Sequence, residues 1–326
     1  MRILLLDDYQ QAATGLADWA RLDAPVDALH HTPADDDERA QRFAGYPVIV
    51  AMRERTPFSA ALLRRLPDLR LLVTTGMANA AIDLPACAAA GVTVCGAPGS
   101  RDSAGATAEM AWALILALAK RLLPSAQALH DGRWQPQLAQ SLAGSTLGLV
   151  GLGRLGRRMA AIGSAFDMRV IAWSPHLTAG RAADAGAEPV DKHTLFSTAD
   201  VVSLHLVLAD STRGIVDRAA LDAMPPHALL VNTSRGPLVD RQALLDTLRA
   251  GRIAGAGLDV FHTEPLPADD ALLSLPNVLA SPHLGYATDD NLRAFYGNAV
   301  AAIEAWRAGM PIRVLAAPPS PSISNG

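Results

Sequence analysis

The sequence predicts an α/β fold with two doubly wound parallel-sheet domains. Short apolar segments alternate with segments of helical composition along most of the 326 residues, and this alternation occurs in two successive series. Such alternation is typical of parallel sheets whose two faces are both covered by helices. A chain of this length is also long enough to form two domains.

The first series covers residues 1–101. Its expected strands are the apolar segments at 3–6, 47–52, 69–75 and 92–95. Pro, Gly and Ser then interrupt the pattern at 97–105. Asp102 or Ser103 is expected to cap a long helix over 104–121. The chain is therefore expected to cross into a second domain at this point.

The second series covers residues 102–285. Its expected strands are at 146–150, 169–173, 201–206, 228–234, 253–260 and 277–281. A last long helix over about 288–309 follows, so the predicted domains are 1–101 plus 286–326, and 102–285. The tail from residue 316 is rich in Pro and Ser and is expected to be disordered.

Composition excludes several classes of partner. The net charge is -4 and the sequence has no basic cluster, so neither nucleic acid nor an anionic membrane is expected to bind. The longest apolar run, 110–119, is far shorter than the roughly 20 residues of a membrane span. Cys87 and Cys95 form neither a metal-ligand spacing nor a disulfide framework. A cytoplasmic protein without a metal site is the expectation.

The strongest single motif opens the second series. Gly151, Gly153 and Gly156 have the G-x-G-x-x-G spacing between an expected strand and an expected helix. In such a loop the first glycine makes the turn, the second admits a pyrophosphate, and the third packs helix on strand. The helix amino terminus, with Arg154 and Leu155, would face the phosphates. The alternative is a tight strand-to-helix turn that binds nothing.

The residue that would bind the adenosine ribose is not acidic. Dinucleotide-binding domains of this type carry Asp or Glu about 20 positions after the glycines. Ser174 stands at the corresponding strand end, and His176, Arg154 or Arg181 are candidate partners for a 2′-phosphate. The sequence therefore predicts NAD or NADP as cofactor and leaves the choice open.

Three later segments carry a family resemblance. "VNTSRGPLVDRQ", "GLDVFHTEPLP" and "SPHLGY" resemble the N-T-x-R-G, G-L-D-V-F-x-x-E-P and P-H-x-G segments of the D-isomer-specific 2-hydroxyacid dehydrogenases, in the same order. The resemblance implies a Rossmann nucleotide domain and a flavodoxin-like substrate domain. It also implies hydride exchange between NAD(P) and a small 2-hydroxy or 2-oxo acid such as glyoxylate or hydroxypyruvate. The family habit is a homodimer formed through the nucleotide domain, with helix 104–121 as a candidate surface.

The same resemblance assigns Arg235, Glu264 and His283 to catalysis. A guanidinium suits the substrate carboxylate because its planar fork can bind both oxygens and stays charged. An imidazole suits proton transfer because it titrates near neutral pH. Glu264 would hydrogen-bond the other imidazole nitrogen and favour the imidazolium. The alternatives are that Arg235 stabilises a loop, that Glu264 lies in a solvated turn, and that His283 is a surface histidine.

Further cofactor contacts are implied at the ends of the later strands. The residues are Leu206, Val207, Thr233, Ser234, Asp259 and Gly285. Asp259 matches the family residue that binds the nicotinamide carboxamide. His205 is interpreted as a packed residue and not as a second catalyst.

The first domain departs from the family pattern. The family's G-x-G-x-D-N-I-D loop is represented by "GMANAAID", in which Ala78 replaces the second glycine. Met77, Ala78 and Asn79 would line the substrate pocket on this alignment. Arg53 is explained equally well as a second cation near the substrate and as an exposed ion-pair residue. The altered loop leaves the identity of the substrate open.

Three other functions remain open at this stage. A formate dehydrogenase is disfavoured, because that branch of the family carries glutamine where this chain has Glu264. Phosphite oxidation is compatible with the same three residues. A corepressor-like protein that senses dinucleotide without turnover is the non-enzymatic alternative.

Overall fold

The structure, a computed structural model, describes residues 1–318 as two compact units. Unit 1 contains residues 1–101 and the chain from Thr288 onward, and unit 2 contains Asp102–Ala287. The second crossing thus falls between 287 and 288, where the sequence suggested 285 and 286. Most of the tail expected to be disordered lies outside the described residues.

The sheet of unit 1 has the strand order β13-β5-β4-β3-β1-β2. Its strands are β1 (Ile3–Leu5), β2 (Val26–Ala28), β3 (Val48–Ala51), β4 (Leu71–Thr75), β5 (Thr93–Ala97) and β13 (Val314–Ala316). All pairs are parallel except β13 with β5. The parallel part has the 2-1-3-4-5 order of flavodoxin-like sheets. The sequence missed β2 and β13, which have three residues each and are only partly buried.

Helices cover both faces of this sheet. They are α1 (Asp36–Phe43), α2 (Ala60–Leu63), α3 (Leu84–Ala89) and α11 (Asp289–Arg307). Phe43, Leu62 and Cys87 from the first three helices join one buried apolar cluster with β1, β3 and β4 residues. The long helix α11 packs against β4 and β5. Burial of apolar side chains on the faces of the sheet accounts for its almost continuous apolar strands.

The sheet of unit 2 has the order β12-β11-β10-β9-β6-β7-β8 and is entirely parallel. Its strands are β6 (Thr146–Val150), β7 (Arg169–Trp173), β8 (Glu188–Pro189), β9 (Val201–Leu204), β10 (Leu229–Asn232), β11 (Gly255–Leu258) and β12 (Val278–Ala280). The sequence missed only β8, which has two exposed residues. This is the 3-2-1-4-5-6 Rossmann order with one added strand. The prediction of two doubly wound α/β domains is confirmed.

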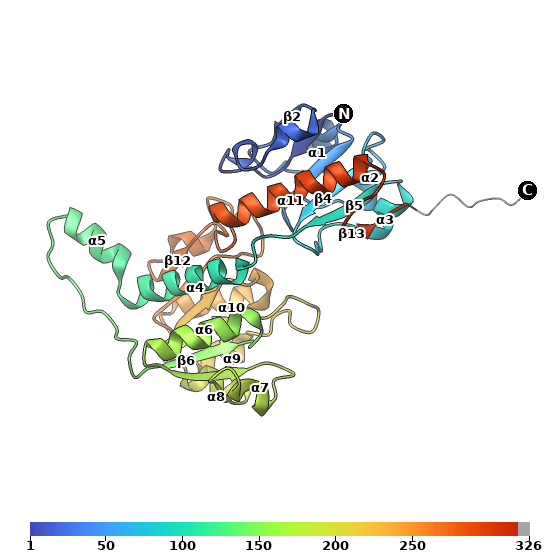
Figure 1. Cartoon of the computed structure of the whole chain (residues 1–326). Coiled ribbons are helices and arrows are strands. Elements are labelled where there is room, and N and C mark those ends of the chain that lie inside the picture. Colours follow the sequence, from blue (N-terminus) through green and yellow to red (C-terminus); the bar gives the residue numbers. More distant parts are fainter. Residues whose placement is uncertain (319–326) are drawn as a thin grey trace, which may run out of the picture. The chain divides into compact units, whose positions relative to one another are not determined.

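Two layers of helices enclose the unit 2 sheet. The helices are α4 (Ser103–Ala119), α5 (Leu122–His130), α6 (Arg154–Ala165), α7 (Ala179–Ala183), α8 (Lys192–Thr198), α9 (Arg218–Ala223) and α10 (Arg241–Arg249). One apolar cluster contains residues of α4 and α6, which run side by side (Figure 1), and a separate cluster contains residues of α8, α9 and α10. The β6–β9 junction, where the strand order reverses, is the expected ligand site of such a sheet.

The helix expected over 104–121 is shorter and is followed by a second helix. α4 ends at Ala119, and Arg121 has a left-handed backbone, with φ of +51°, before α5 begins. Asp102 precedes α4, but its carboxylate does not cap the helix; it accepts a hydrogen bond from Arg158 at 2.8 Å. Across residues 1–318, no helix has the length and apolar composition needed to cross a membrane.

Candidate active site

The glycine loop joins β6 to α6, and each of its glycines meets a different steric demand. Gly151 has φ of +103°, and a Cβ there would lie 2.6 Å from the carbonyl oxygen of His205. A Cβ on Gly156 would lie 2.2 Å from the carbonyl oxygen of Gly151. A Cβ on Gly153 would meet no atom within 4 Å. The loop therefore packs tightly at its two ends and leaves open space at its centre, as a bound pyrophosphate requires.

The end of β7 lies directly beside this loop. The backbone N–H of Gly151 donates a hydrogen bond to the carbonyl of Trp173 at 2.8 Å. Ser174 follows and is half-buried, whereas His176 and Arg154 are exposed. Ser174 thus stands at the carboxyl end of a strand adjacent to the glycine loop, which is the position of a ribose-binding residue.

Strands β9 and β10 bring two buried polar atoms to the same edge of the sheet. Among the described residues, Nδ1 of His205 and Oγ1 of Thr233 have no hydrogen-bond partner. The other ring nitrogen of His205 lies 2.9 Å from Oγ of Ser203, and burial lowers the pKa of His205 to about 3. Ser234 donates to the carbonyl of Leu204 at 2.8 Å and so ties the ends of the two strands together. Buried polar atoms without a protein partner are uncommon and suit a site that receives a ligand.

Leu206 and Val207 continue the chain after β9. Leu206 is half-buried, and the side chain of Val207 is 83% exposed. The exposure of Val207 leaves room for the backbone contact with the dinucleotide that the sequence suggested. Leu155, in the first turn of α6, is half-buried against the α4–α6 cluster.

The Arg235 loop is shaped by its neighbour Asn232. The amide of Asn232 donates to the carbonyl of Arg235 at 2.9 Å and accepts from the N–H of Ser234 at 3.0 Å. The guanidinium of Arg235 donates to the carbonyl of Ser234 at 2.7 Å. Arg235 is half-buried, so its position is constrained while part of its surface stays accessible.

Gly236 joins the Arg235 loop to the loop that carries Glu264. A Cβ on Gly236 would lie 2.2 Å from the carbonyl carbon of Phe261 and 2.6 Å from the backbone nitrogen of His262. The N–H of Phe261 in turn donates to Oε1 of Glu264 at 2.9 Å. Two segments that are distant in the sequence are therefore in backbone contact next to both charged side chains.

Glu264 and His283 form a direct pair. Oε2 of Glu264 lies 2.6 Å from Nδ1 of His283, and each side chain is 19% exposed. The ring of His283 also meets the ring of Tyr286 edge-on, at 5.5 Å between centroids. An imidazole held at one nitrogen by a carboxylate has a fixed orientation, and it can exchange a proton through the other nitrogen.

The carboxylate of Asp259 holds the His283 loop in place through three hydrogen bonds. Its Oδ1 accepts from Oγ of Ser281 at 2.6 Å and from the N–H of Leu284 at 2.7 Å, and its Oδ2 accepts from the N–H of Gly285 at 2.8 Å. Asp259 is fully buried. His283 has φ of +55°, a left-handed conformation that is uncommon for histidine. The three hydrogen bonds to Asp259 hold the loop in this conformation.

The residues expected to contact substrate lie on unit 1, where β3 and β4 end. The exposed Arg53 pairs with Glu54 at 3.3 Å, and a Cβ on Gly76 would lie 3.1 Å from Cδ of Arg53. Met77 and Ala78 are exposed. Arg53, Met77 and Ala78 therefore lie on or beside adjoining loops of unit 1.

Asn79 supports the same loop from within. It is only 8% exposed, and its amide donates to Oγ1 of Thr74 at 2.9 Å. Its carbonyl oxygen accepts from the N–H groups of Ala81 at 3.0 Å and Glu54 at 3.2 Å. The side chain thus braces the loop from inside, through three hydrogen bonds within unit 1.

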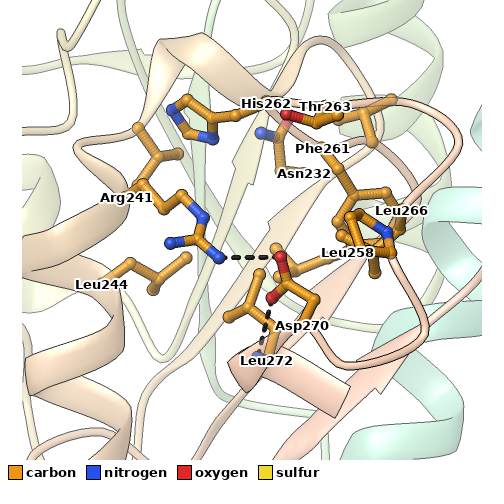
Figure 2. Close-up of a pocket in the computed structure, with 14 residues that line it drawn as sticks. Asn232, Arg241, Leu244, Leu258, Phe261, His262, Thr263, Leu266, Asp270 and Leu272 are labelled. Atoms are coloured by element: carbon orange, nitrogen blue, oxygen red, sulfur yellow. Dashed lines mark hydrogen bonds and ion pairs between the residues drawn. The ribbon is translucent and has the colours of Figure 1, made fainter. Parts of the chain in front are cut away.

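Residues of the Arg235 loop and of the Glu264 loop also line a pocket of unit 2 (Figure 2). Its wall includes Asn232, Gly236, Phe261 and Thr263, but none of the three expected catalytic residues. Arg241 and Asp270 face each other across it and form an ion pair at 2.7 Å. This pocket is therefore distinct from the Glu264–His283 pair.

Asn232 and Gly236 are the positioning residues that sequence reasoning missed. Both belong to the "NTSRG" segment, so the signal was present in the motif. Their roles depend on hydrogen bonding within the loop and on contact with Phe261, which spacing alone does not reveal.

Comparison with known proteins places these features in a family. Residues 112–285 match the family model "D-isomer specific 2-hydroxyacid dehydrogenase, NAD binding domain". The chain is 36% identical to a hydroxypyruvate reductase of Thermotoga maritima over 75% of this chain and 80% of the relative. It is 37% identical to a glyoxylate reductase of Thermococcus litoralis over 70% of this chain and 71% of the relative.

A longer relative and a solved structure support the same family membership. The chain also matches a D-3-phosphoglycerate dehydrogenase of Mycobacterium leprae at 36% identity over 78% of its length, but the match spans only 48% of that enzyme. A crystal structure of a phosphoglycerate oxidoreductase from Vibrio cholerae superposes with a TM-score of 0.90 at 39% identity, covering 95% of this chain and 99% of the other.

Proposed function

Because the chain belongs to the D-isomer-specific 2-hydroxyacid dehydrogenase family, we propose that it transfers hydride between NAD(P) and a small 2-hydroxy or 2-oxo acid. The observation that carries this proposal is the Glu264–His283 pair at 2.6 Å, with Glu264 on a loop in backbone contact with the Arg235 loop. Hydroxypyruvate and glyoxylate are the proposed substrates, because the similar enzymes reported above are named for them.

The glycine loop of unit 2 is the proposed dinucleotide site. The open space at Gly153 fits a pyrophosphate, and the amino terminus of α6 favours its negative charge. Thr233 and His205 each offer a buried polar atom without a protein partner among the described residues. The nicotinamide, when bound, supplies or accepts the hydride.

Arg235, His283 and Glu264 divide the remaining work of reduction. Arg235 binds the substrate carboxylate and polarises the adjacent carbonyl. His283 donates a proton to the new alkoxide oxygen. Glu264 holds the ring through Nδ1 and so fixes its orientation. In the oxidative direction the same ring accepts the proton from the hydroxyl.

Asp259 and Gly285 complete the site in this proposal. Asp259 fastens the His283 loop, and its carboxylate also lies beside Gly285, where a Cβ would be 3.1 Å away. The nicotinamide carboxamide is the proposed additional partner of Asp259. We further propose unit 1 as the substrate unit, with Arg53, Met77 and Ala78 as substrate contacts and Asn79 as the brace of their loop.

A homodimer through unit 2 is the proposed assembly, with α4 and the segment after it as the candidate surface. α4 buries Trp112 and Ile115 within the unit and exposes Glu109 and Ala113. The exposed apolar side chains lie in the segment that follows, at Leu122, Leu123, Leu129, Trp134 and Leu138. An apolar patch of this kind is typical of an interface.

We also propose a cytoplasmic location, which suits the two free cysteines.

A turnover assay tests the proposed function. Purified protein is mixed with NADH or NADPH and with glyoxylate, hydroxypyruvate, pyruvate and bulkier 2-oxo acids, and the loss of nicotinamide absorbance is followed. Turnover with at least one 2-oxo acid is expected. Tight dinucleotide binding without turnover on any of them would favour a sensor, and turnover of phosphite or formate alone would assign a different branch of the family.

A further inference from the structure

The rim of the dinucleotide site offers no carboxylate to the adenosine ribose. The hydrogen bond from Gly151 to Trp173, at 2.8 Å, fixes the end of β7 against the glycine loop, so the ribose of a dinucleotide bound there meets the next residues. Positions 174–178 are Ser, Pro, His, Leu and Thr. The acid that binds both ribose hydroxyls of NAD and repels a 2′-phosphate is therefore missing from this loop.

The acidic residues on the neighbouring strand are engaged elsewhere. Asp191 follows β8, but its Oδ1 accepts from the N–H of Thr194 at 2.9 Å and its Oδ2 accepts from the Thr194 hydroxyl at 2.6 Å. These bonds make it the cap of α8 and lower its pKa. Glu188 pairs at 2.6 Å with Arg169, which begins β7 at the opposite edge of the sheet. Neither carboxylate takes the place of the missing acid.

Cationic and hydroxyl groups occupy this rim instead. Arg154 is the first residue of α6, His176 lies in the loop after β7, and Arg181 lies in α7. All three are exposed. Ser174 is half-buried and carries a hydroxyl that can donate to a phosphate oxygen.

We propose that Ser174, Arg154 and His176 bind the 2′-phosphate of NADP(H), so that the chain prefers NADPH to NADH. This inference rests on the proposed function, because it concerns the cofactor of that same site. Charge-assisted hydrogen bonds to a phosphate are stronger than neutral ones, and no opposing carboxylate stands in positions 174–178. NADPH is expected to bind at least about tenfold more tightly than NADH.

Equilibrium binding tests the proposal without relying on turnover. Dissociation constants for NADPH and NADH are measured by quenching of protein fluorescence, and 2′,5′-ADP is compared with 5′-AMP as a displacing ligand. Ser174→Asp is expected to weaken NADPH binding by about tenfold or more while NADH binding is kept or improved. His176→Ala is expected to weaken NADPH binding severalfold and to leave NADH binding unchanged.

Arg154 has a matched control on the same helix. Arg154→Ala and Arg157→Ala remove the same charge from exposed positions of α6, but only Arg154 stands at its amino terminus. Arg154→Ala is expected to reduce the NADPH preference, and Arg157→Ala is expected to leave it intact. If both variants lost the same amount of NADPH preference, only the overall positive charge near the site would matter, and Arg154 would not be part of the phosphate site.

The outcomes separate this inference from the proposed function. Tighter binding of NADPH and of 2′,5′-ADP in the unaltered protein, reversed by Ser174→Asp, would support it. NADH binding as tightly as NADPH would overturn it and leave the proposed reaction standing. Binding of neither dinucleotide would overturn the proposed function itself.

Discussion

Gly236→Ala tests whether the contact between the Arg235 and Glu264 loops matters for catalysis. The added Cβ would lie 2.2 Å from the carbonyl carbon of Phe261, whereas carbon atoms in contact are separated by about 3.5 Å or more. The obstructing atoms are backbone, so rotation of a side chain cannot relieve the overlap. One loop must therefore move by about 1 Å relative to the other.

This displacement has two measurable consequences. Overpacking of this kind costs about 1–3 kcal/mol of the free energy of unfolding, which urea denaturation measures. A shift of about 1 Å between Arg235 and Glu264 is expected to lower kcat/KM about 100-fold, while the Kd of the dinucleotide changes little. Steady-state kinetics at saturating cofactor measure kcat/KM, and fluorescence titration measures the Kd of the dinucleotide.

A glycine in open space provides the control. Gly297 lies in α11, and a Cβ there would meet no atom within 4 Å. Gly297→Ala should therefore keep full activity and gain a little stability from the helix propensity of alanine. If Gly236→Ala retained the activity of Gly297→Ala, the two loops would not be coupled as the geometry indicates.

Three further substitutions probe the proposed site. His283→Ala is expected to lower turnover by about 10²–10⁴-fold with nearly unchanged dinucleotide affinity, and normal turnover would remove His283 from the mechanism. Glu264→Gln removes the carboxylate that holds the His283 ring at 2.6 Å, so kcat should fall by about tenfold or more while the Kd of the dinucleotide changes little, and a wild-type kcat would contradict the pairing. Arg235→Lys keeps the charge but loses the planar fork, so kcat/KM should fall by at least about tenfold, and wild-type kinetics would show that bidentate binding is unnecessary.

The fold was predictable from the sequence wherever strands are buried and mainly apolar. β3, β4, β6 and β9 bury every or nearly every residue, and apolar residues make up most of each strand. β8 has two exposed residues and forms only because β7 offers an unpaired edge, which no local pattern records. β13 forms at the other sheet by antiparallel pairing with β5, more than 200 residues earlier in the chain.

Some residues of the candidate site could likewise be identified from the sequence, and others only from the folded structure. Gly151, Gly153 and Gly156 were identifiable because they have a fixed spacing between a strand and a helix, although the close approach of Gly151 to the His205 carbonyl is not visible in that spacing. The place of Asn79 in the loop follows from the family resemblance, whereas the direction of its side chain does not. That direction depends on Thr74 and Glu54, which approach only in the folded unit.

His205 and His283 each follow a strand of unit 2, and their surroundings assign them different chemistry. Burial without a counter-charge lowers the pKa of His205 to about 3, so its ring stays neutral from mildly acidic to alkaline pH. A ring that does not gain a proton in that range cannot donate one to an alkoxide or shape the pH profile there. His283 has a carboxylate at 2.6 Å and keeps 19% of its side chain exposed, so its ring is held in one orientation and stays accessible to substrate. The proton donor of the proposed reaction is therefore the histidine on the strained loop and not the one packed against Ser203.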